Sequence, residues 1–145
     1  MAEVTVQVAV PPSRVWETLA DGWLYSAWVV GTSKIRAVDS DFPAPGTKIY
    51  HAVGLWPVLL EDETEVLESR PEQRLVLQAR AWPMGEATVT LELVPTADGT
   101  AVRMIETPTK GPASWVNNPV AEKMLRHRMA ECLNRLVPLV EGHCS

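Results

Sequence analysis

The sequence predicts an α+β fold in which one long C-terminal helix covers one face of an antiparallel sheet. Two features of the residue pattern lead to this class. A run of about six segments with strand-like apolar patterning occupies residues 32–107. An apolar stripe at helical spacing then extends from residue 119 almost to the end of the chain. The length of 145 residues suits one domain, which we expect to span residues 1–145.

The chain begins with a strand and two short helical segments. Residues 3–10 place valine at alternate positions and predict the first strand. The segment PPSRVWETLAD carries helix-start signals in its two prolines and Ser13, and its apolar residues recur at helical spacing. Residues 22–31 predict a second short helix or an irregular turn. Both short helices therefore precede the main run of strands.

Further strands are predicted between the short helices and the C-terminal helix. They lie at residues 32–39, 48–56, 58–68, 75–82, 86–94 and 100–107. Turn residues separate them, and Asp98-Gly99 in the segment PTADG predicts a hairpin between the last two strands. Consecutive strands joined by short turns are typical of an antiparallel sheet.

The C-terminal helix begins with a capping signal, because Asn118 can cap a helix whose first residue is Pro119. Its predicted apolar stripe consists of Ala121, Leu125, Met129, Cys132, Leu136 and Val140. Its charged and polar residues are expected mostly off that stripe, at Lys123, Arg126, His127, Arg128 and Glu131. Pro138 is expected to kink or loosen the last turn.

Composition excludes several functional classes. The formal net charge of -5 argues against the basic surface that nucleic-acid binding requires. No apolar run approaches the roughly 18 residues of a membrane span, so we expect no stable membrane insertion. The first ten residues lack the features of a secretory signal. Cys132 and Cys144 suggest two reduced thiols, and together these features predict a cytoplasmic protein.

One histidine lies in a strand that otherwise looks buried. In the segment KIYHAVGLW, His51 shares a face with Ile49, Val53 and Leu55. A buried imidazole needs a partner for its N–H group. His51 is therefore either a polar anchor or general acid–base group in a cavity, or a structural residue bonded to a neighbouring strand or to water.

Glu106 is the second candidate for chemistry. It has the same strand parity as Val102 and Met104, so it points inward if they do. Near His51, a carboxylate would fix the tautomer of the ring and raise its pKa. The alternative, which we expect because strand ends reach solvent, places Glu106 beyond the pocket mouth, solvated or paired with Lys110.

The remaining charged and metal-binding residue types form no recognisable catalytic motif. Arg80 and Arg103 have outward parity and are expected to carry exposed charges of little energetic consequence. The acidic run at 61–65 is expected to be mostly solvated surface, with Asp62 able to enter the cavity. His51, His127 and His143 have no metal-ligand spacing with the cysteines, so we expect no metal and no cofactor.

The order of elements resembles a known family. The resemblance rests on VPPSRVWETLAD near the start, PTADGTAVRM in the middle and ECLNRLVPLVE near the end. Together they are similar to the START-like, Bet v 1-type helix-grip superfamily, in its polyketide cyclase/dehydrase-like (SRPBCC) branch. This resemblance implies a curved sheet of about seven antiparallel strands around the long helix. It also implies a cavity for a lipid, sterol, polyketide or other hydrophobic molecule.

We expect this cavity to lie between the sheet and the C-terminal helix. Its predicted lining is Tyr25, Trp28, His51, Val53, Leu55, Trp56, Leu77, Trp82, Leu91, Met104, Trp115, Met124, Leu125 and Met129. Six tryptophans against two tyrosines and one phenylalanine are unusual, and such large rings often border partly enclosed space. The tryptophans near loops either form the rim of the cavity or anchor those loops to the sheet.

Three functions remain in competition. The first, which we favour, is binding or carriage of a small hydrophobic molecule, oriented by His51 with Tyr25 or Glu106. The second is a metal-free enzyme of the aromatase/cyclase or dehydratase type that uses His51 or Glu106 for proton transfer. The third is a regulatory module that binds a protein partner and has a collapsed cavity. The sequence does not identify the ligand, the pathway or the oligomeric state.

Overall fold

The computed structural model describes residues 1–29, 32–55, 58–82, 85–115 and 118–142. Its strands are β1 (Ala2–Val8), β2 (Thr32–Val38), β3 (Lys48–Leu55), β4 (Val58–Arg70), β5 (Arg74–Ala81), β6 (Gly85–Thr96) and β7 (Gly99–Lys110). Its helices are α1 (Pro12–Leu19), the 3₁₀ turn η1 (Gly22–Leu24), α2 (Tyr25–Trp28), α3 (Pro112–Trp115) and α4 (Pro119–Gly142).

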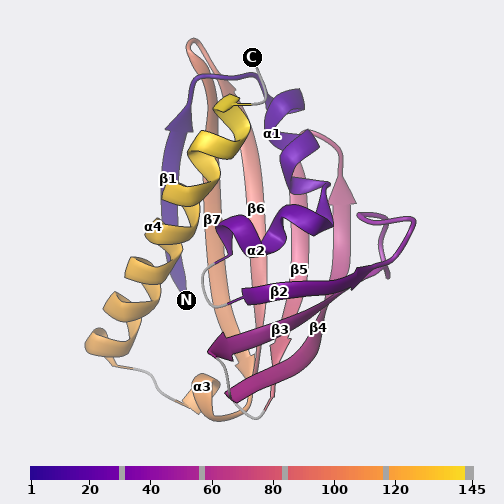
Figure 1. The fold of residues 1–145 in the computed structure, drawn as a ribbon. Helices are drawn as coiled ribbons and strands as arrows, with labels where there is room; N and C mark the ends of the chain where they lie inside the picture. Colours follow the sequence, from indigo (N-terminus) through magenta and orange to yellow (C-terminus); the bar gives the residue numbers. More distant parts are fainter. Residues whose placement is uncertain (30–31, 56–57, 83–84, 116–117, 143–145) are drawn as a thin grey trace.

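The strands form one antiparallel sheet in the order β1-β7-β6-β5-β4-β3-β2. Strands β2 to β7 therefore neighbour one another in chain order, whereas β1 pairs with β7 at one edge. Figure 1 shows the sheet curving around α4 and the short helices. The α+β helix-grip prediction is confirmed.

Two glycines set the connections of β6. A Cβ at Gly99, where φ is +152°, would overlap the carbonyl oxygen of Val8. A Cβ at Gly85, where φ is +131°, would overlap the carbonyl oxygen of Lys110. Only glycine tolerates such close backbone approach in this conformation. The predicted hairpin at Asp98-Gly99 is confirmed, since β6 ends at Thr96 and β7 begins at Gly99.

The core lies between the sheet and the part of α4 that begins at Met129. The α4 residues that it contains are Met129, Cys132, Leu133, Leu136 and Val140. They meet Val15 and Leu19 from α1 and the buried leucines of β5 and β6 in one continuous cluster. Gly22 in η1 packs directly on Val38 and Ile49 of the sheet, because a Cβ there would approach both. The sheet and η1 therefore pack tightly where β2 and β3 meet Gly22.

The first turns of α4 lie outside this core. The helix begins as predicted, since the amide N–H of Ala121 donates to Oδ1 of Asn118 at 2.8 Å. Val120 and Met124, however, are each 68% exposed. The predicted disturbance at Pro138 does not end the helix, which continues to Gly142. The helix is thus anchored from Leu125 onward, and its first turns are not. None of the described helices has the length and apolar content needed to cross a membrane.

The outer face of the sheet carries a network of ion pairs. Arg80 and Arg103 lie there as predicted, but Arg80 is less exposed than we expected. Its side chain is 24% exposed and lies within 3.6 Å of carboxylate oxygens on Glu63, Glu65 and Glu86. Three carboxylates around one guanidinium hold it against the sheet, which the strand parity alone does not indicate.

Candidate functional site

His51 lies on the helix-covered side of the sheet. It is 4% exposed, and its neighbour on the same strand face, Ile49, belongs to the buried core. Its ring Nε2 lies 2.9 Å from Oγ1 of Thr64 on β4, and the two share a hydrogen bond. Bonding to a neighbouring strand is the structural role that we considered for this residue. It accounts for only one of the two ring nitrogens.

The other ring nitrogen of His51 is enclosed and unpartnered. Nδ1 makes no hydrogen bond within the described part of the chain. Burial lowers the pKa of the ring. The charges of Asp62 and Glu63 and the polar backbone of Glu63 oppose this shift, whereas the charge of Arg36 adds to it. The imidazole is therefore neutral at pH 7. A neutral ring with one unused nitrogen can donate to or accept from a bound molecule, depending on its tautomer.

Helix α2 adds a second enclosed nitrogen. Trp28 is 1% exposed, and its indole Nε1 has no hydrogen-bond partner among the described residues. Its ring centroid lies 5.0 Å from that of Tyr25, at an interplanar angle of 58°. Burial strongly raises the pKa of the Tyr25 phenol, with smaller contributions from Cys132 and Glu106. Trp28 shares one buried cluster with Ile49, so both unused nitrogens lie on the same side of the sheet.

Glu106 is placed differently from our expectation. It is buried, at 5% exposure, and both its carboxylate oxygens accept from Nη2 of Arg128, at 2.7 and 2.6 Å. Its expected position in solvent, or paired with Lys110, is wrong, because α4 packs along β1, which pairs with β7 at Glu106, and brings Arg128 to the carboxylate. No described contact joins Glu106 to His51. The carboxylates that act on His51 are those of Asp62 and Glu63.

The predicted cavity residues divide into three groups. Tyr25, Trp28, His51, Leu77, Leu91, Met104 and Met129 are buried, and Leu125 is partly buried against the core. Trp82, Trp115 and Met124 are exposed, at 44%, 78% and 68%. The side chains of Val53 and Leu55, and all of Trp56, lie outside the described residues.

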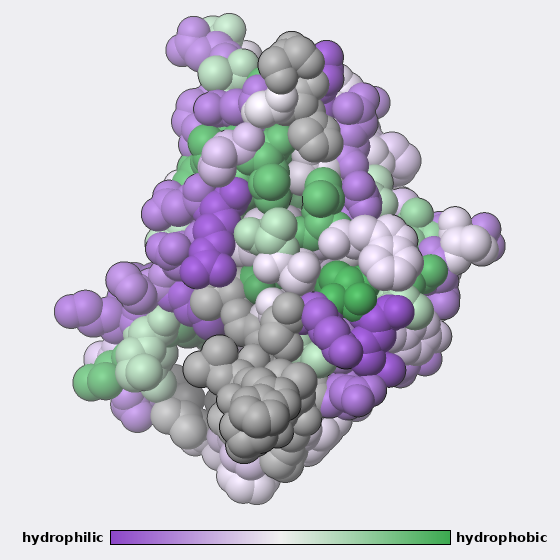
Figure 2. All heavy atoms as spheres, viewed as in Figure 1, coloured by the Kyte–Doolittle hydropathy of each residue, from purple (hydrophilic) through white to green (hydrophobic). Residues whose placement is uncertain are grey.

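The exposed members of the predicted lining have identifiable positions. The indole N–H of Trp82 donates to Oε2 of Glu86 at 2.9 Å, so its ring ties the end of β5 to the start of β6. Trp115 is in α3, and Met124 faces solvent on the part of α4 that lies outside the core. Figure 2 shows hydrophobic residues gathered in the middle of the helix-bearing face, between margins of hydrophilic residues.

The acidic residues at 61–65 form ion pairs and hydrogen bonds within the sheet. Asp62 accepts from the backbone N–H groups of Glu63 and Trp82, each at 2.9 Å, so its carboxylate holds the backbone. The three glutamates of the run pair with Arg36, Lys48 and Arg80. Among the described residues, no three histidine, cysteine, aspartate or glutamate side chains are grouped to hold a metal ion.

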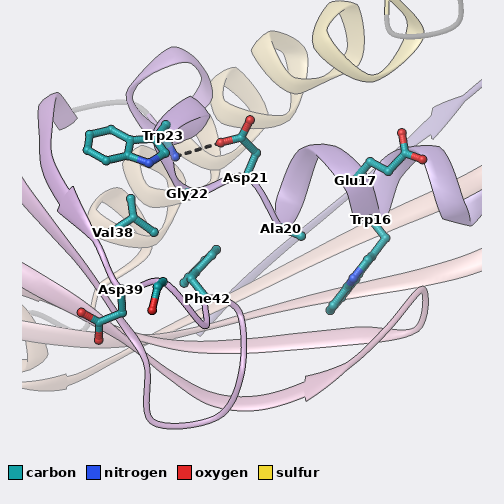
Figure 3. A pocket seen from close by; sticks show the side chains of 10 residues that line it. Trp16, Glu17, Ala20, Asp21, Gly22, Trp23, Val38, Asp39 and Phe42 are labelled. Atoms are coloured by element: carbon teal, nitrogen blue, oxygen red, sulfur yellow. Dashed lines mark hydrogen bonds between the residues drawn. The ribbon is translucent and has the colours of Figure 1, made fainter.

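A separate groove of about 540 Å³ opens on the surface between α1, η1 and the β2–β3 connection. We call it the acidic groove, and its main side chains are Trp16, Glu17, Asp21, Trp23, Asp39 and Phe42 (Figure 3). Its two walls are distant in the chain, so no local pattern of residues predicts the groove. The signal available was the pairing of aromatic with acidic residues in both segments.

The fold is that of a helix-grip protein, and its apolar core contains buried polar atoms without a hydrogen-bond partner. The chain belongs to the family described as polyketide cyclase/dehydrase and lipid transport, whose model matches residues 1–141. No curated protein was found to match the chain.

Solved structures share the fold. The Zhui aromatase/cyclase from Streptomyces sp. R1128 is 18% identical with a TM-score of 0.74, covering 99% of this chain and 94% of that one. A Rhodobacter sphaeroides protein is 23% identical with a TM-score of 0.74, covering 97% and 91%. A Chromobacterium violaceum protein is 18% identical with a TM-score of 0.72, covering 96% of each chain. At these identities the likeness concerns the fold alone.

Proposed function

We propose that this protein binds a small hydrophobic molecule between the sheet and its helices, with His51 holding a polar group of the ligand. The observation that carries the proposal is the pair of enclosed, unpartnered nitrogens, Nδ1 of His51 and Nε1 of Trp28. Nearly all buried polar atoms in folded proteins have a partner, and exceptions call for an explanation such as a ligand or an ordered water. Membership of a lipid-transport and polyketide family supports the first explanation.

The chemistry of the two nitrogens restricts the ligand. The indole of Trp28 can only donate a hydrogen bond, so its partner carries an acceptor oxygen or nitrogen. The neutral ring of His51 accommodates a hydroxyl or carbonyl in either tautomer. The surrounding leucine and methionine side chains supply affinity through burial, at about 25 cal/mol per Å² of apolar surface removed from water. A mainly apolar molecule with at least one oxygen atom satisfies the requirements of the indole, the imidazole and the apolar walls.

A second candidate, catalysis of the cyclase or dehydratase type, rests on the protonation state of His51. A neutral imidazole with a lowered pKa can accept a proton at neutral pH, as a general base must. Glu106 suits this role less well, because Arg128 already neutralises its charge. His51 is therefore the residue to test for turnover.

Native mass spectrometry of the purified protein, with solvent extraction, tests the binding proposal. We expect a reproducible apolar passenger, or capture of one from a panel containing a fatty acid, a sterol and a hydroxylated naphthalene. His51→Leu and Trp28→Phe should both weaken retention, whereas Trp23→Phe, at a site 58% exposed, should not. A protein that stays free of ligand against the whole panel would contradict the proposal. Turnover lost in His51→Leu with binding retained would establish the enzyme instead.

A further inference from the structure

The acidic groove has a composition that the interior site does not share. Its aromatic lining residues are Trp16, Trp23 and Phe42, and its acidic ones are Glu17, Asp21 and Asp39. No lysine or arginine is among the residues that line it. Asp21 and Asp39 each accept one backbone hydrogen bond, from Trp23 and Lys48, and all three carboxylates keep their negative charge at the rim. An apolar floor with such a rim favours an occupant that is apolar and basic at once.

The shape of the groove favours an extended occupant. In Figure 3 the aromatic side chains are spread along the groove, with Phe42 between Trp23 and Trp16, and do not surround a single point. Such an arrangement does not form the cage that a compact cation requires. It suits the side of a helix, whose residues contact a groove at several points in a row.

The same chain carries a matching surface on the first turns of α4. Val120, Lys123, Met124 and His127 are spaced at i, i+3, i+4 and i+7, so they share one face, and all four are exposed. We call this the exposed α4 face. Arg126 borders it, and neither Lys123 nor Arg126 has an ion pair with any described residue. Glu122 lies one turn before Arg126 on the side of the helix next to this face, and it is not among the four residues of the face.

We propose that the acidic groove of one copy binds the exposed α4 face of a second copy. The two surfaces are complementary, since one joins aromatic rings to carboxylates and the other joins apolar side chains to cationic ones. Figure 1 places the start of α4 and the β2–β3 connection on opposite sides of the molecule, so one copy cannot make this contact with itself. The interface is separate from the interior site and does not depend on its ligand.

The geometry determines how the copies assemble. The contact joins two different surfaces, so it is heterologous, and it closes into a dimer only if both copies satisfy both contacts at once. The charged groups of both surfaces are exposed, so salt screens their attraction. We expect weak, salt-sensitive association, roughly tenfold weaker at about 0.5 M than at 0.05 M ionic strength.

Sedimentation velocity with paired charge reversals tests the proposal. The groove variant is Glu17→Lys/Asp21→Lys, and the helix variant is Lys123→Glu/Arg126→Glu. Each variant alone should self-associate at least about tenfold more weakly than the wild type, because like charges then face each other. An equimolar mixture of the two should recover association, since each reversed surface meets an oppositely charged partner.

The remaining outcomes overturn the proposal. The first is a wild-type protein that stays monomeric up to about 1 mM, the upper end of weak binding. The second is a charge-reversed variant that associates as tightly as the wild type. The third is a mixture of the two variants that associates no more tightly than either variant alone. Because Asp21 accepts a hydrogen bond from the backbone of Trp23, its replacement could disturb folding. Glu17→Lys alone leaves that bond intact and should give a smaller loss in the same direction.

Discussion

Removing Arg128 should destabilise the protein more than removing the charge of Glu106. The two partners differ in exposure, since the side chain of Glu106 is 7% exposed and that of Arg128 is 39% exposed. Arg128→Met leaves a carboxylate buried without its counter-charge, which costs about 2–4 kcal/mol of unfolding free energy. Glu106→Gln leaves a guanidinium that water can reach and an amide that still accepts a hydrogen bond. We expect a loss of about 1 kcal/mol.

Urea unfolding followed by circular dichroism measures both losses. The double variant Arg128→Met/Glu106→Gln should be more stable than the sum of the single losses predicts, by about 1–2 kcal/mol, because no uncompensated charge then remains. Arg135→Met is the matched control on the same helix: its partner Glu131 is 48% exposed, and we expect a loss below about 0.5 kcal/mol. Equal single losses, the opposite order, or strict additivity would refute this account of the pair.

Three further predictions use the same unfolding assay. Burial lowers the pKa of His51 below the unfolded value of about 6.5, so the unfolded chain takes up a proton that the folded one does not as pH falls through that window. Stability should therefore drop from pH 8 towards pH 5, and the drop should be smaller in His51→Gln; an identical pH dependence would contradict burial of the ring. Gly85→Ala should lower the free energy of unfolding by more than about 3 kcal/mol, because its Cβ would overlap a backbone carbonyl oxygen. Gly46→Ala has open space around it and should lower that free energy by only about 1 kcal/mol, for its φ of +87°. Similar losses in the two variants would argue against the overlap. Met129→Ala should cost about 2–5 kcal/mol and Met124→Ala less than about 0.5 kcal/mol, and a large loss at Met124 would mean that the start of α4 is packed.

Local patterns in the sequence were sufficient to predict the fold. Alternation located every strand to within a few residues, and Asp98-Gly99 and Asn118 marked a hairpin and a helix start that the structure contains. Strand parity also placed His51 on the buried side; it pointed Glu106 inward as well, but our expectation that the strand end reaches solvent was wrong. These successes share a cause, since each depends on residues close together in the chain.

The partners of those buried groups could not be predicted in the same way. Arg128 immediately precedes Met129, at the edge of the apolar stripe. A pattern based on apolar residues predicts that such a charged side chain faces solvent. Its actual place depends on how α4 packs along β1, next to β7, which no local pattern contains. The exposure of Met124 has the same origin, because it reflects where α4 leaves the core.

The pairing of β1 with β7 has a consequence for the order in which the chain can fold. Strands β2 to β7 each pair with a sequence neighbour, so they can assemble by closing short loops. The ion pair between Glu3 and Arg103, by contrast, joins residues 100 positions apart. During synthesis β1 therefore has no partner until β7 has emerged, and α4, which packs along β1, follows later still. The pairing of β1 with β7 becomes a late step of folding, and a nascent chain would expose an unpaired β7 edge until it occurs.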